Sequence, residues 1–264
     1  MNAVIAYGTG RGTTAQIAEA ISEGMNNAGV KATAISIEYL ALMPARITAA
    51  DIVGIGSPVH FYRETRYIKN FISALPKLEG KRAFVFCTHG MDRVGETLHR
   101  LYRAMVERGA CVVGVEAFRS AMSYHPLRKR GLGNGDNLPD VSVLEAARRF
   151  GERVAGTETS EPLVAPRIST LTKLKGRLLA NTSFRKLVFP GVRLDVTKCT
   201  GYGQCMSRCL VTGLARKDGE VIPYVTESCV RCLECIAWCP REAIEADSRV
   251  KEWLSTLSSR LGIH

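Results

Sequence analysis

Short apolar runs alternate with longer amphipathic stretches through residues 1–156 of the chain. The runs are typical of strands buried on both faces of a parallel sheet, and the stretches carry apolar residues at helical spacing, as at Ile17, Ile21 and Met25. We expect strands near 2–7, 31–37, 51–57, 81–88 and 111–118, and helices near 13–28, 63–75, 93–108 and 142–155. The alternation predicts an α/β fold, a doubly wound parallel sheet with right-handed crossovers and the strand order 2-1-3-4-5.

The pattern changes beyond this region. Residues 119–141 are rich in Gly, Asn, Pro and Arg and predict a long loop on the side of the sheet where ligands bind. Further on, Leu171, Leu174 and Leu178 have the spacing of a short amphipathic helix. The expected divisions are a first domain (1–156), a basic linker (157–192), a smaller α+β domain (193–246) and a C-terminal helix (247–264).

Composition is consistent with two globular domains. The chain has 264 residues, 46% of them hydrophobic, and nine are cysteines. No uninterrupted apolar stretch reaches the roughly eighteen residues of a membrane span, and no signal segment precedes the first strand. We therefore expect a cytoplasmic protein, in which many cysteines indicate metal binding rather than disulfides.

The formal net charge of +11 is partly local, because seven Lys or Arg and no acidic residue occur from Pro166 to Arg193. This segment either docks the acidic surface of a redox partner, makes a peripheral membrane contact, or is a solvated helix on the protein's own surface. Nucleic acid is not an expected partner, since no recognition motif accompanies the charge.

The cysteines near the C-terminus have a specific spacing. Cys229, Cys232, Cys235 and Cys239, the last followed by Pro240, form a C-x2-C-x2-C-x3-C-P run. Thiolates at these intervals hold iron–sulfur clusters in bacterial ferredoxins, whereas zinc sites use separated pairs. The run predicts an iron–sulfur protein.

The same pattern occurs thirty residues earlier, with one change. Its positions are Cys199, Tyr202, Cys205 and Cys209. Two such runs indicate a two-cluster domain, in which the fourth cysteine of each run ligates the cluster of the other run. The two predicted ligand sets are Cys209, Cys229, Cys232 and Cys235 for a [4Fe–4S] cluster, and Cys199, Cys205 and Cys239 for a second cluster.

Tyr202 occupies the position where the second cluster would take its fourth cysteine. A phenol is neutral at pH 7 and is a poor substitute for a thiolate. We expect a [3Fe–4S] cluster, as in seven-iron ferredoxins. Two alternatives remain open: a [4Fe–4S] cluster with an unusual fourth ligand, and an empty site.

A different motif follows the first predicted strand. Residues 8–14 read G-T-G-R-G-T-T and lead directly into a predicted helix. Glycines, hydroxyls and a helix N-terminus after a strand form a phosphate-binding arrangement. The segment is neither a dinucleotide fingerprint nor a Walker A loop, because it lacks their residue patterns.

Residues 3–21 resemble flavodoxins without gaps. The segment S-P-V-H-F-Y-R at 57–63 is similar to a loop of protoporphyrinogen-oxidase-type flavodoxins and of flavodoxin–ferredoxin fusions, and T-H-G-M-D at 88–92 follows the next strand. The chain is identified as a member of the flavodoxin–ferredoxin fusion family, which implies bound FMN. The implied FMN-binding residues are Thr9, Gly10, Arg11, Gly12, Thr13, Thr14, Ser57, Pro58, Val59, His60, Phe61, Tyr62, Thr88, His89, Gly90, Met91 and Asp92.

Several of these residues have two interpretations. His60 and His89 either contact the flavin or make structural or solvent contacts. Phe61 and Tyr62 either stack on the flavin ring or pack against the strand. Arg11 either pairs with the phosphate or faces solvent.

The predicted function is electron transfer: a relay between a ferredoxin-level donor, the two clusters, FMN and a redox partner protein. A second hypothesis is an FMN-dependent oxidoreductase that acts on a small molecule such as a quinone or porphyrinogen, with His60, Arg63 and the 119–141 loop shaping its pocket. A third is a basic binding protein with a structural cluster, which would hold no flavin.

Overall fold

The computed structural model describes residues 1–91, 93–158 and 161–247. The contacts divide the chain into two compact units. The first unit comprises Met1–Met122 and Gly133–Gly176, and the second comprises Ser123–Leu132 and Arg177–His264. The predicted helix over 247–264 lies outside the described residues, except for its first position.

The first unit is built on a parallel sheet with the strand order β2-β1-β3-β5-β6. Its strands are β1 (Asn2–Tyr7), β2 (Lys31–Ser36), β3 (Ile52–His60), β5 (Arg82–His89) and β6 (Cys111–Arg119), and the short β4 (Arg63–Glu64) pairs antiparallel with β3. This arrangement confirms the predicted doubly wound order 2-1-3-4-5. The central residues of β1, β3 and β5 are buried in unbroken runs, as expected for strands covered on both faces of the sheet.

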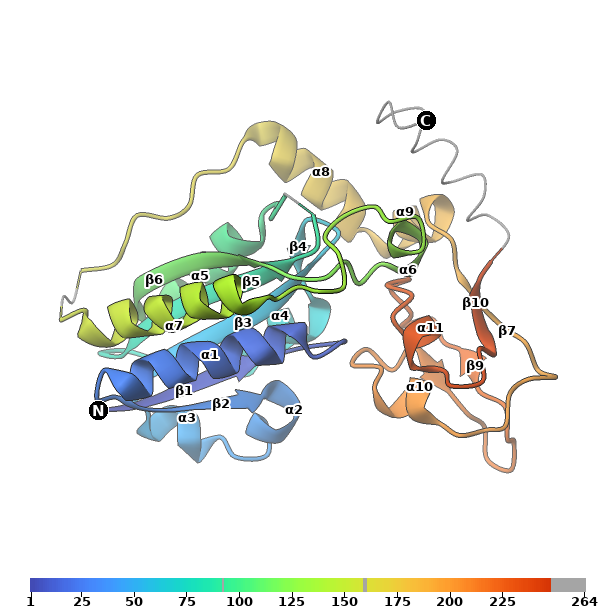
Figure 1. Ribbon diagram of the computed structural model, residues 1–264, viewed down its shortest axis with the longest axis horizontal. Coiled ribbons are helices and arrows are strands. Elements are labelled where there is room, and N and C mark those ends of the chain that lie inside the picture. The colour runs from blue at the N-terminus through green and yellow to red at the C-terminus, as the bar shows by residue number, and fades with distance from the viewer. Residues whose placement is uncertain (92, 159–160, 248–264) are drawn as a thin grey trace. The chain divides into compact units, whose positions relative to one another are not determined.

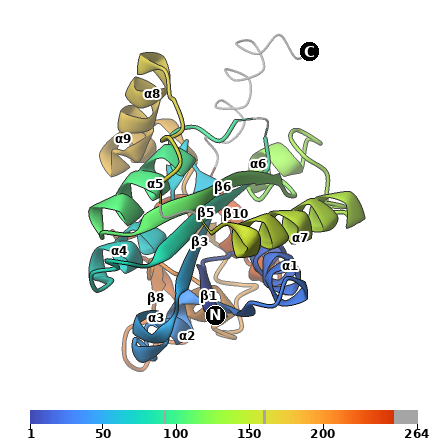
Figure 2. The same cartoon turned by 90° about the vertical axis from the view of Figure 1, so that its left-hand side faces the viewer.

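Helices cover the two faces of this sheet (Figures 1 and 2). They are α1 (Thr13–Asn27), α2 (Ile37–Leu40), α3 (Ala45–Ala49), α4 (Arg66–Ala74), α5 (Thr97–Glu107) and α7 (Val141–Gly156). On one face α1 and α7 pack side by side, with Ile17, Ile21 and Phe150 in the core; on the other, α4 and α5 contribute Ile68 and Leu101. Alternating positions along the strands contribute to one core or the other: Val4 and Ala6 of β1 belong to one cluster, Ala3 and Ile5 to the other.

The structure differs from the expected elements in a few places. The strand predicted to end at residue 57 continues to His60 and turns back as a hairpin with β4, so the following helix starts at Arg66 rather than near 63. The helix predicted to start near 93 starts at Thr97, because residues 93–96 belong to the loop between β5 and α5. The short helices α2 and α3 were not expected.

The chain after α7 first runs along the edge of the first unit. The Leu163 N–H donates to the Val112 carbonyl at 2.8 Å, and the Pro166 carbonyl lies 2.8 Å from His99 Nδ1. The expected amphipathic helix follows as α8 (Thr170–Ala180), and the division between the two units falls within it.

The second unit contains α6 (His125–Arg128), α9 (Thr182–Val188), β7 (Val192–Leu194), α10 (Gln204–Ser207), β8 (Leu214–Ala215), β9 (Tyr224–Val225), α11 (Cys235–Trp238) and β10 (Ile244–Ala246). Strand β7 pairs with β10 and β8 with β9, both antiparallel. Its small apolar core includes Leu214, Trp238 and Ile244, in contact with several cysteines. The small antiparallel sheets confirm the predicted α+β ferredoxin-like domain.

Part of the predicted 119–141 loop belongs to this second unit. Tyr124, which precedes α6, packs its ring at right angles to that of Phe189, with 6.2 Å between the ring centroids. The Arg231 guanidinium donates to the Phe189 carbonyl. This segment of the loop is therefore part of the framework around the second cysteine run.

Among the described helices, none combines the length and the apolar character that a membrane span requires.

Candidate cofactor sites

The first loop places phosphate-binding groups at the carboxyl end of β1. Gly12, which precedes α1, has a left-handed backbone with φ of 87°, and no side chain caps the helix. The Gly12 N–H donates to the Thr9 hydroxyl at 2.9 Å, which closes the loop. An uncapped helix N-terminus presents N–H groups that attract an anion, so residues 9–14 fit the phosphate of FMN.

Thr14 links this loop to the end of β5. Its hydroxyl lies 2.8 Å from the hydroxyl of Thr88, and the two residues are 1% and 2% exposed. Either hydroxyl can be the donor in this contact. When Thr88 donates, Thr14 would offer a phosphate both its hydroxyl and its backbone N–H; when Thr14 donates, it would offer the backbone N–H alone.

Arg11 lies across the same edge of the sheet. Its guanidinium donates to the Met122 carbonyl at 3.2 Å and lies 4.0 Å from the Asp136 carboxylate. The side chain therefore ties the first loop to the segment that follows β6, which the sequence did not predict.

The second predicted loop is a hairpin rather than an irregular loop. His60 pairs with Arg63, and between them Phe61 and Tyr62 both have left-handed backbones, with φ of 51° and 70°. Two successive residues of this kind form the tight turn that suits a two-residue hairpin, at an energetic cost that is typical of functional sites. Ser57 is fully buried, and its hydroxyl accepts from the Thr65 N–H at 3.2 Å.

Two ion pairs hold this hairpin on α5. Arg63 contacts the Glu96 carboxylate at 3.0 Å, and Arg100 contacts Glu64 at 2.7 Å. Both carboxylates are almost fully buried, with side chains 7% and 5% exposed. Since breaking a buried pair leaves an uncompensated charge, these contacts fix the hairpin firmly. Arg63 is engaged in this ion pair, and its side chain is 19% exposed.

The third predicted loop is held by a residue that the sequence did not reveal. Asn134 donates through its side chain to the His89 carbonyl at 3.0 Å, and its backbone N–H donates to the Gly90 carbonyl at 2.8 Å. The Met122 N–H donates to the Asn134 carbonyl at 3.0 Å. Nothing local distinguishes Asn134, because its contacts join segments far apart in the sequence.

The structure describes His89 and Met91 of the third loop but not Asp92. The His89 ring contacts the Met91 carbonyl, and Met91 is 42% exposed. Asp92 lies outside the described residues. The three loops thus meet at the carboxyl edge of the sheet, where open α/β sheets bind ligands.

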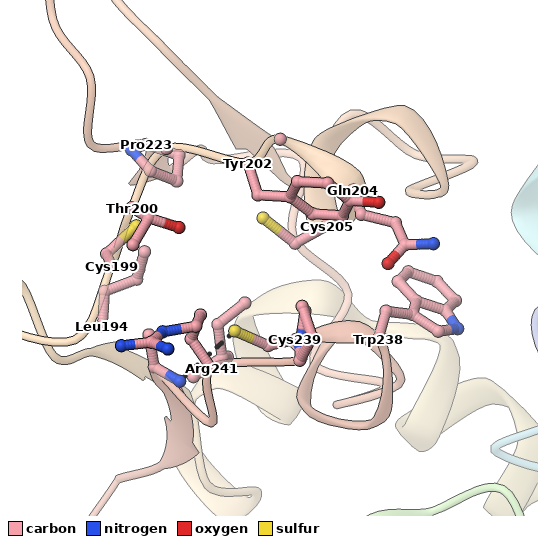
Figure 3. Close-up of a pocket in the computed structure, with 15 residues that line it drawn as sticks. Leu194, Cys199, Thr200, Tyr202, Gln204, Cys205, Pro223, Trp238, Cys239 and Arg241 are labelled. Carbon is pink, nitrogen blue, oxygen red and sulfur yellow. Dashed lines mark hydrogen bonds between the residues drawn. The ribbon is translucent and has the colours of Figure 1, made fainter.

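The second unit brings together one set of three thiols from both cysteine runs. Cys199, Cys205 and Cys239 line a single pocket with Tyr202 and Arg241 (Figure 3). Cys239 belongs to the second run but lies with the first two cysteines of the earlier run. This is the crossed arrangement that a two-cluster domain requires.

The other predicted ligand set also combines cysteines of both runs: Cys209 of the first run with Cys229, Cys232 and Cys235 of the second. Burial raises the pKa of the Cys235 thiol, and the nearby charges of Cys229 and Cys209 raise it further. The pKa of Cys232 is also raised by burial, with smaller contributions from Glu234, Cys235 and Cys209. The geometry places Cys209 of the first run beside the second run, because a Cβ atom at Gly213 would lie 3.3 Å from Cys209 Sγ and 3.4 Å from Cys229 Cβ. Buried thiols with raised pKa values must lose their protons when iron binds.

Backbone N–H groups support one thiol of each set. The Gly213 N–H lies 3.1 Å from Cys209 Sγ, and the Ala243 N–H lies 3.3 Å from Cys239 Sγ. Hydrogen bonds of this kind tune the reduction potential of a bound cluster. In the described residues, no group of three or more His, Cys, Asp or Glu is arranged to hold a single metal ion; the donor chemistry that fits is a thiolate-held cluster.

Tyr202 lines the pocket of the first set but is 69% exposed. In Figure 3 it lies beside Cys205 and Gln204. The first set therefore offers three thiols and a corner open to solvent.

Comparisons with known proteins agree with these two units. Residues 4–115 match the model of a flavodoxin domain, and residues 191–240 match that of a 4Fe-4S dicluster domain. The chain therefore carries a flavodoxin domain followed by a 4Fe-4S dicluster domain, the composition of a flavodoxin–ferredoxin fusion.

Solved flavodoxins resemble the first unit. A flavodoxin from the domain Archaea is 20% identical, covering 59% of this chain and 96% of that one with a TM-score of 0.45. Oxidised flavodoxin 1 from Bacillus cereus is 17% identical, with 60% of this chain and 100% of that chain covered and a TM-score of 0.46. A WrbA-like flavodoxin from Agrobacterium tumefaciens is 25% identical, with 58% of this chain and 94% of that chain covered and a TM-score of 0.42. A comparison with curated proteins found no match.

The two domains define the class of protein. A flavodoxin domain together with a 4Fe-4S dicluster domain makes the chain an electron-transfer flavo-iron-sulfur protein. FMN and 4Fe–4S clusters are the cofactors that these domains indicate.

Proposed function

We propose that this chain relays electrons between two iron–sulfur clusters, FMN and a redox partner protein. The observation that carries the proposal is the crossed grouping of the cysteines, with Cys239 beside Cys199 and Cys205, in a chain that also has a flavodoxin domain. Clusters pass single electrons and flavins accept one or two, so a chain that holds both can couple the two kinds of transfer.

The FMN would be held by the three loops at the carboxyl edge of the sheet. Residues 9–14 would bind its phosphate through backbone N–H groups, and the hairpin turn at Phe61 and Tyr62 would lie beside its ring. The Thr14–Thr88 contact and Asn134 would fix the loops before the cofactor arrives. Preformed loops lower the ordering cost of binding.

The first thiol set is proposed to hold a [3Fe–4S] cluster. Three cysteines surround its pocket, and the fourth position carries an exposed phenol in place of a thiol. The second set, with four cysteines, would hold a [4Fe–4S] cluster. Because cluster type and charge set the potential, the two centres would differ in potential and give the relay a direction.

The partner is proposed to be a redox protein with an acidic docking surface, and the donor a protein of ferredoxin-like potential. The basic residues from Pro166 to Arg193 support this, because opposite charges accelerate encounter between carriers. All nine cysteines are free of disulfides, which fits a cytoplasmic setting.

A second candidate is direct oxidation or reduction of a small molecule at the FMN, for example a quinone or porphyrinogen. It is favoured by a cavity that shares Tyr62 with the predicted FMN site. A relay without its own substrate would show electron transfer to a partner protein but no turnover of such a molecule.

The test is the iron and FMN content of anaerobically purified protein, with EPR spectra of the same sample. The proposal predicts about seven irons and one FMN per chain together with a three-iron signal. About eight irons would mean that another ligand completes the first cluster, and about four that the first site is empty. A flavin-free sample would refute the relay.

A further inference from the structure

A cavity of about 300 Å³ lies beside the hairpin turn of the first unit. Three separate segments form its walls. Its lining residues are Tyr62 of the turn, Arg93 and Gly95 of the loop after β5, and Leu171, Thr172 and Lys175 of α8. The volume is at the lower end of the range for small-molecule sites.

The helical wall is positioned by a glycine. A Cβ atom at Gly176 would lie 1.7 Å from Glu96 Oε1 and 3.2 Å from Arg63 Nε, so α8 can lie directly on this buried ion pair only without a side chain there. Thr172 is one helical turn before Gly176 and shares its face. The ion pair therefore determines which residues of α8 face the cavity.

The opposite wall is equally fixed. The Glu96 N–H donates to the Tyr62 carbonyl at 2.7 Å. Gly95 has φ of 59°, and a Cβ atom there would lie 2.3 Å from that carbonyl oxygen. The hairpin turn and the loop after β5 are thus in close contact, and the cavity is preformed.

The described lining residues of this cavity include two cations, Arg93 and Lys175. Within the described part of the chain, the side chains of Arg93 and Lys175 make no hydrogen bond or ion pair, and none of the described lining residues is acidic. Two cations that face one space repel each other, and a bound anion converts that repulsion into two favourable contacts.

The other lining residues suit an apolar body. Tyr62 presents an aromatic ring, and Leu171, a residue that is 59% exposed, presents an aliphatic side chain. We propose that the cavity binds an anionic organic small molecule, with its carboxylate or phosphate between Arg93 and Lys175 and its apolar part against Tyr62. Because Tyr62 also belongs to the predicted FMN site, the bound molecule would be a substrate or regulator of the flavin, a role that rests on the proposed function.

The experiment is fluorine NMR on the full FMN-loaded chain. The probes are 4-fluorobenzoate, 4-fluorophenyl phosphate and, as the neutral control, 4-fluorobenzamide. We expect saturable binding of at least one anionic probe and none of the amide, and the tighter of the two anions identifies the head group. Arg93→Gln and Lys175→Gln should each weaken binding about tenfold, as expected for one charged hydrogen bond. Lys173→Gln, an exposed position of α8 outside the cavity, should have no effect.

Three results would overturn the inference: no saturable binding of either anion, equal binding of the amide, or equal effects of Lys173→Gln and Lys175→Gln. Release of FMN by the probe would also overturn it, because the cavity would then be part of the flavin site. FMN content is measured in each sample. A flavin-free chain contradicts the proposed function, whereas a flavin-loaded chain that ignores both anions contradicts this inference alone.

Discussion

Thr212 and Glu242, thirty residues apart, have the same left-handed backbone, with φ of 49° at both. Each lies three residues after the last cysteine of its run, and the next residue in each half donates its N–H to that cysteine. Gly201 and Arg231, which are also thirty residues apart, both have left-handed backbones, with φ of 70° and 58°. The sequence repeat is therefore also a repeat of backbone conformation, and it places Cys209 and Cys239 in equivalent positions.

This equivalence predicts which cluster each of these cysteines serves. Cys209→Ser should abolish the four-iron signal, although Cys209 belongs to the first run, because its thiol lies with Cys229 and Cys235. Cys239→Ser should instead abolish the three-iron signal. EPR and iron content of anaerobic samples measure both. Loss of the four-iron signal in Cys239→Ser, with the other signal intact, would contradict the crossed arrangement.

Replacing Tyr202 should complete the first cluster. The residue lines the pocket at the position equivalent to Cys232, so Tyr202→Cys should add about one iron per chain and remove the three-iron signal. Tyr202→Phe is the matched control, since it removes only the hydroxyl. If Tyr202→Phe also changes the cluster, the phenol is itself a ligand and the proposed three-iron site is wrong.

The Thr14–Thr88 contact should contribute to stability. Thr14→Val or Thr88→Val leaves the other hydroxyl buried without its partner and should lower the free energy of unfolding by about 1–3 kcal/mol. The double variant should lose less than the sum of the two. Denaturant unfolding of the flavin-free chain measures these effects, with Thr48→Val, at an exposed position, as the control. Strict additivity would mean that the two hydroxyls do not interact.

Gly95 should be required for FMN binding. Gly95→Ala introduces a Cβ atom against the Tyr62 carbonyl and should displace the hairpin turn, weakening FMN binding about tenfold or more. Gly80→Ala is the matched control: its φ of 74° gives comparable backbone strain, but a Cβ atom there meets nothing within 4 Å. Flavin fluorescence titration compares the two. Equal FMN affinities would exclude a role for the turn in flavin binding.

The sequence predicted the elements with strong periodicity and missed those formed by distant contacts. The strands of the parallel sheet and the helices α1 and α7 lie within a few residues of their expected ranges, because their apolar patterns are long. The hairpin at Phe61 and Tyr62 was missed, since neither residue is a glycine or asparagine that would signal a left-handed turn.

The same distinction holds for the sites. The cysteine sets could be predicted because the spacing itself encodes the crossed ligation. Asn134, the Arg63–Glu96 pair and the inclusion of Tyr124 in the second unit could not, because each depends on which segments the fold brings together. Assignment of individual residues to FMN stays a prediction.

The central claim is that electrons pass between the clusters and FMN within one chain. The direct measurement is flash photoreduction of the anaerobic holoprotein by less than one electron per chain, followed by the absorbance of the flavin and the clusters. The relay predicts redistribution between clusters and flavin at a rate that does not depend on protein concentration, as for an intramolecular step. A rate proportional to protein concentration, or no redistribution, would contradict it.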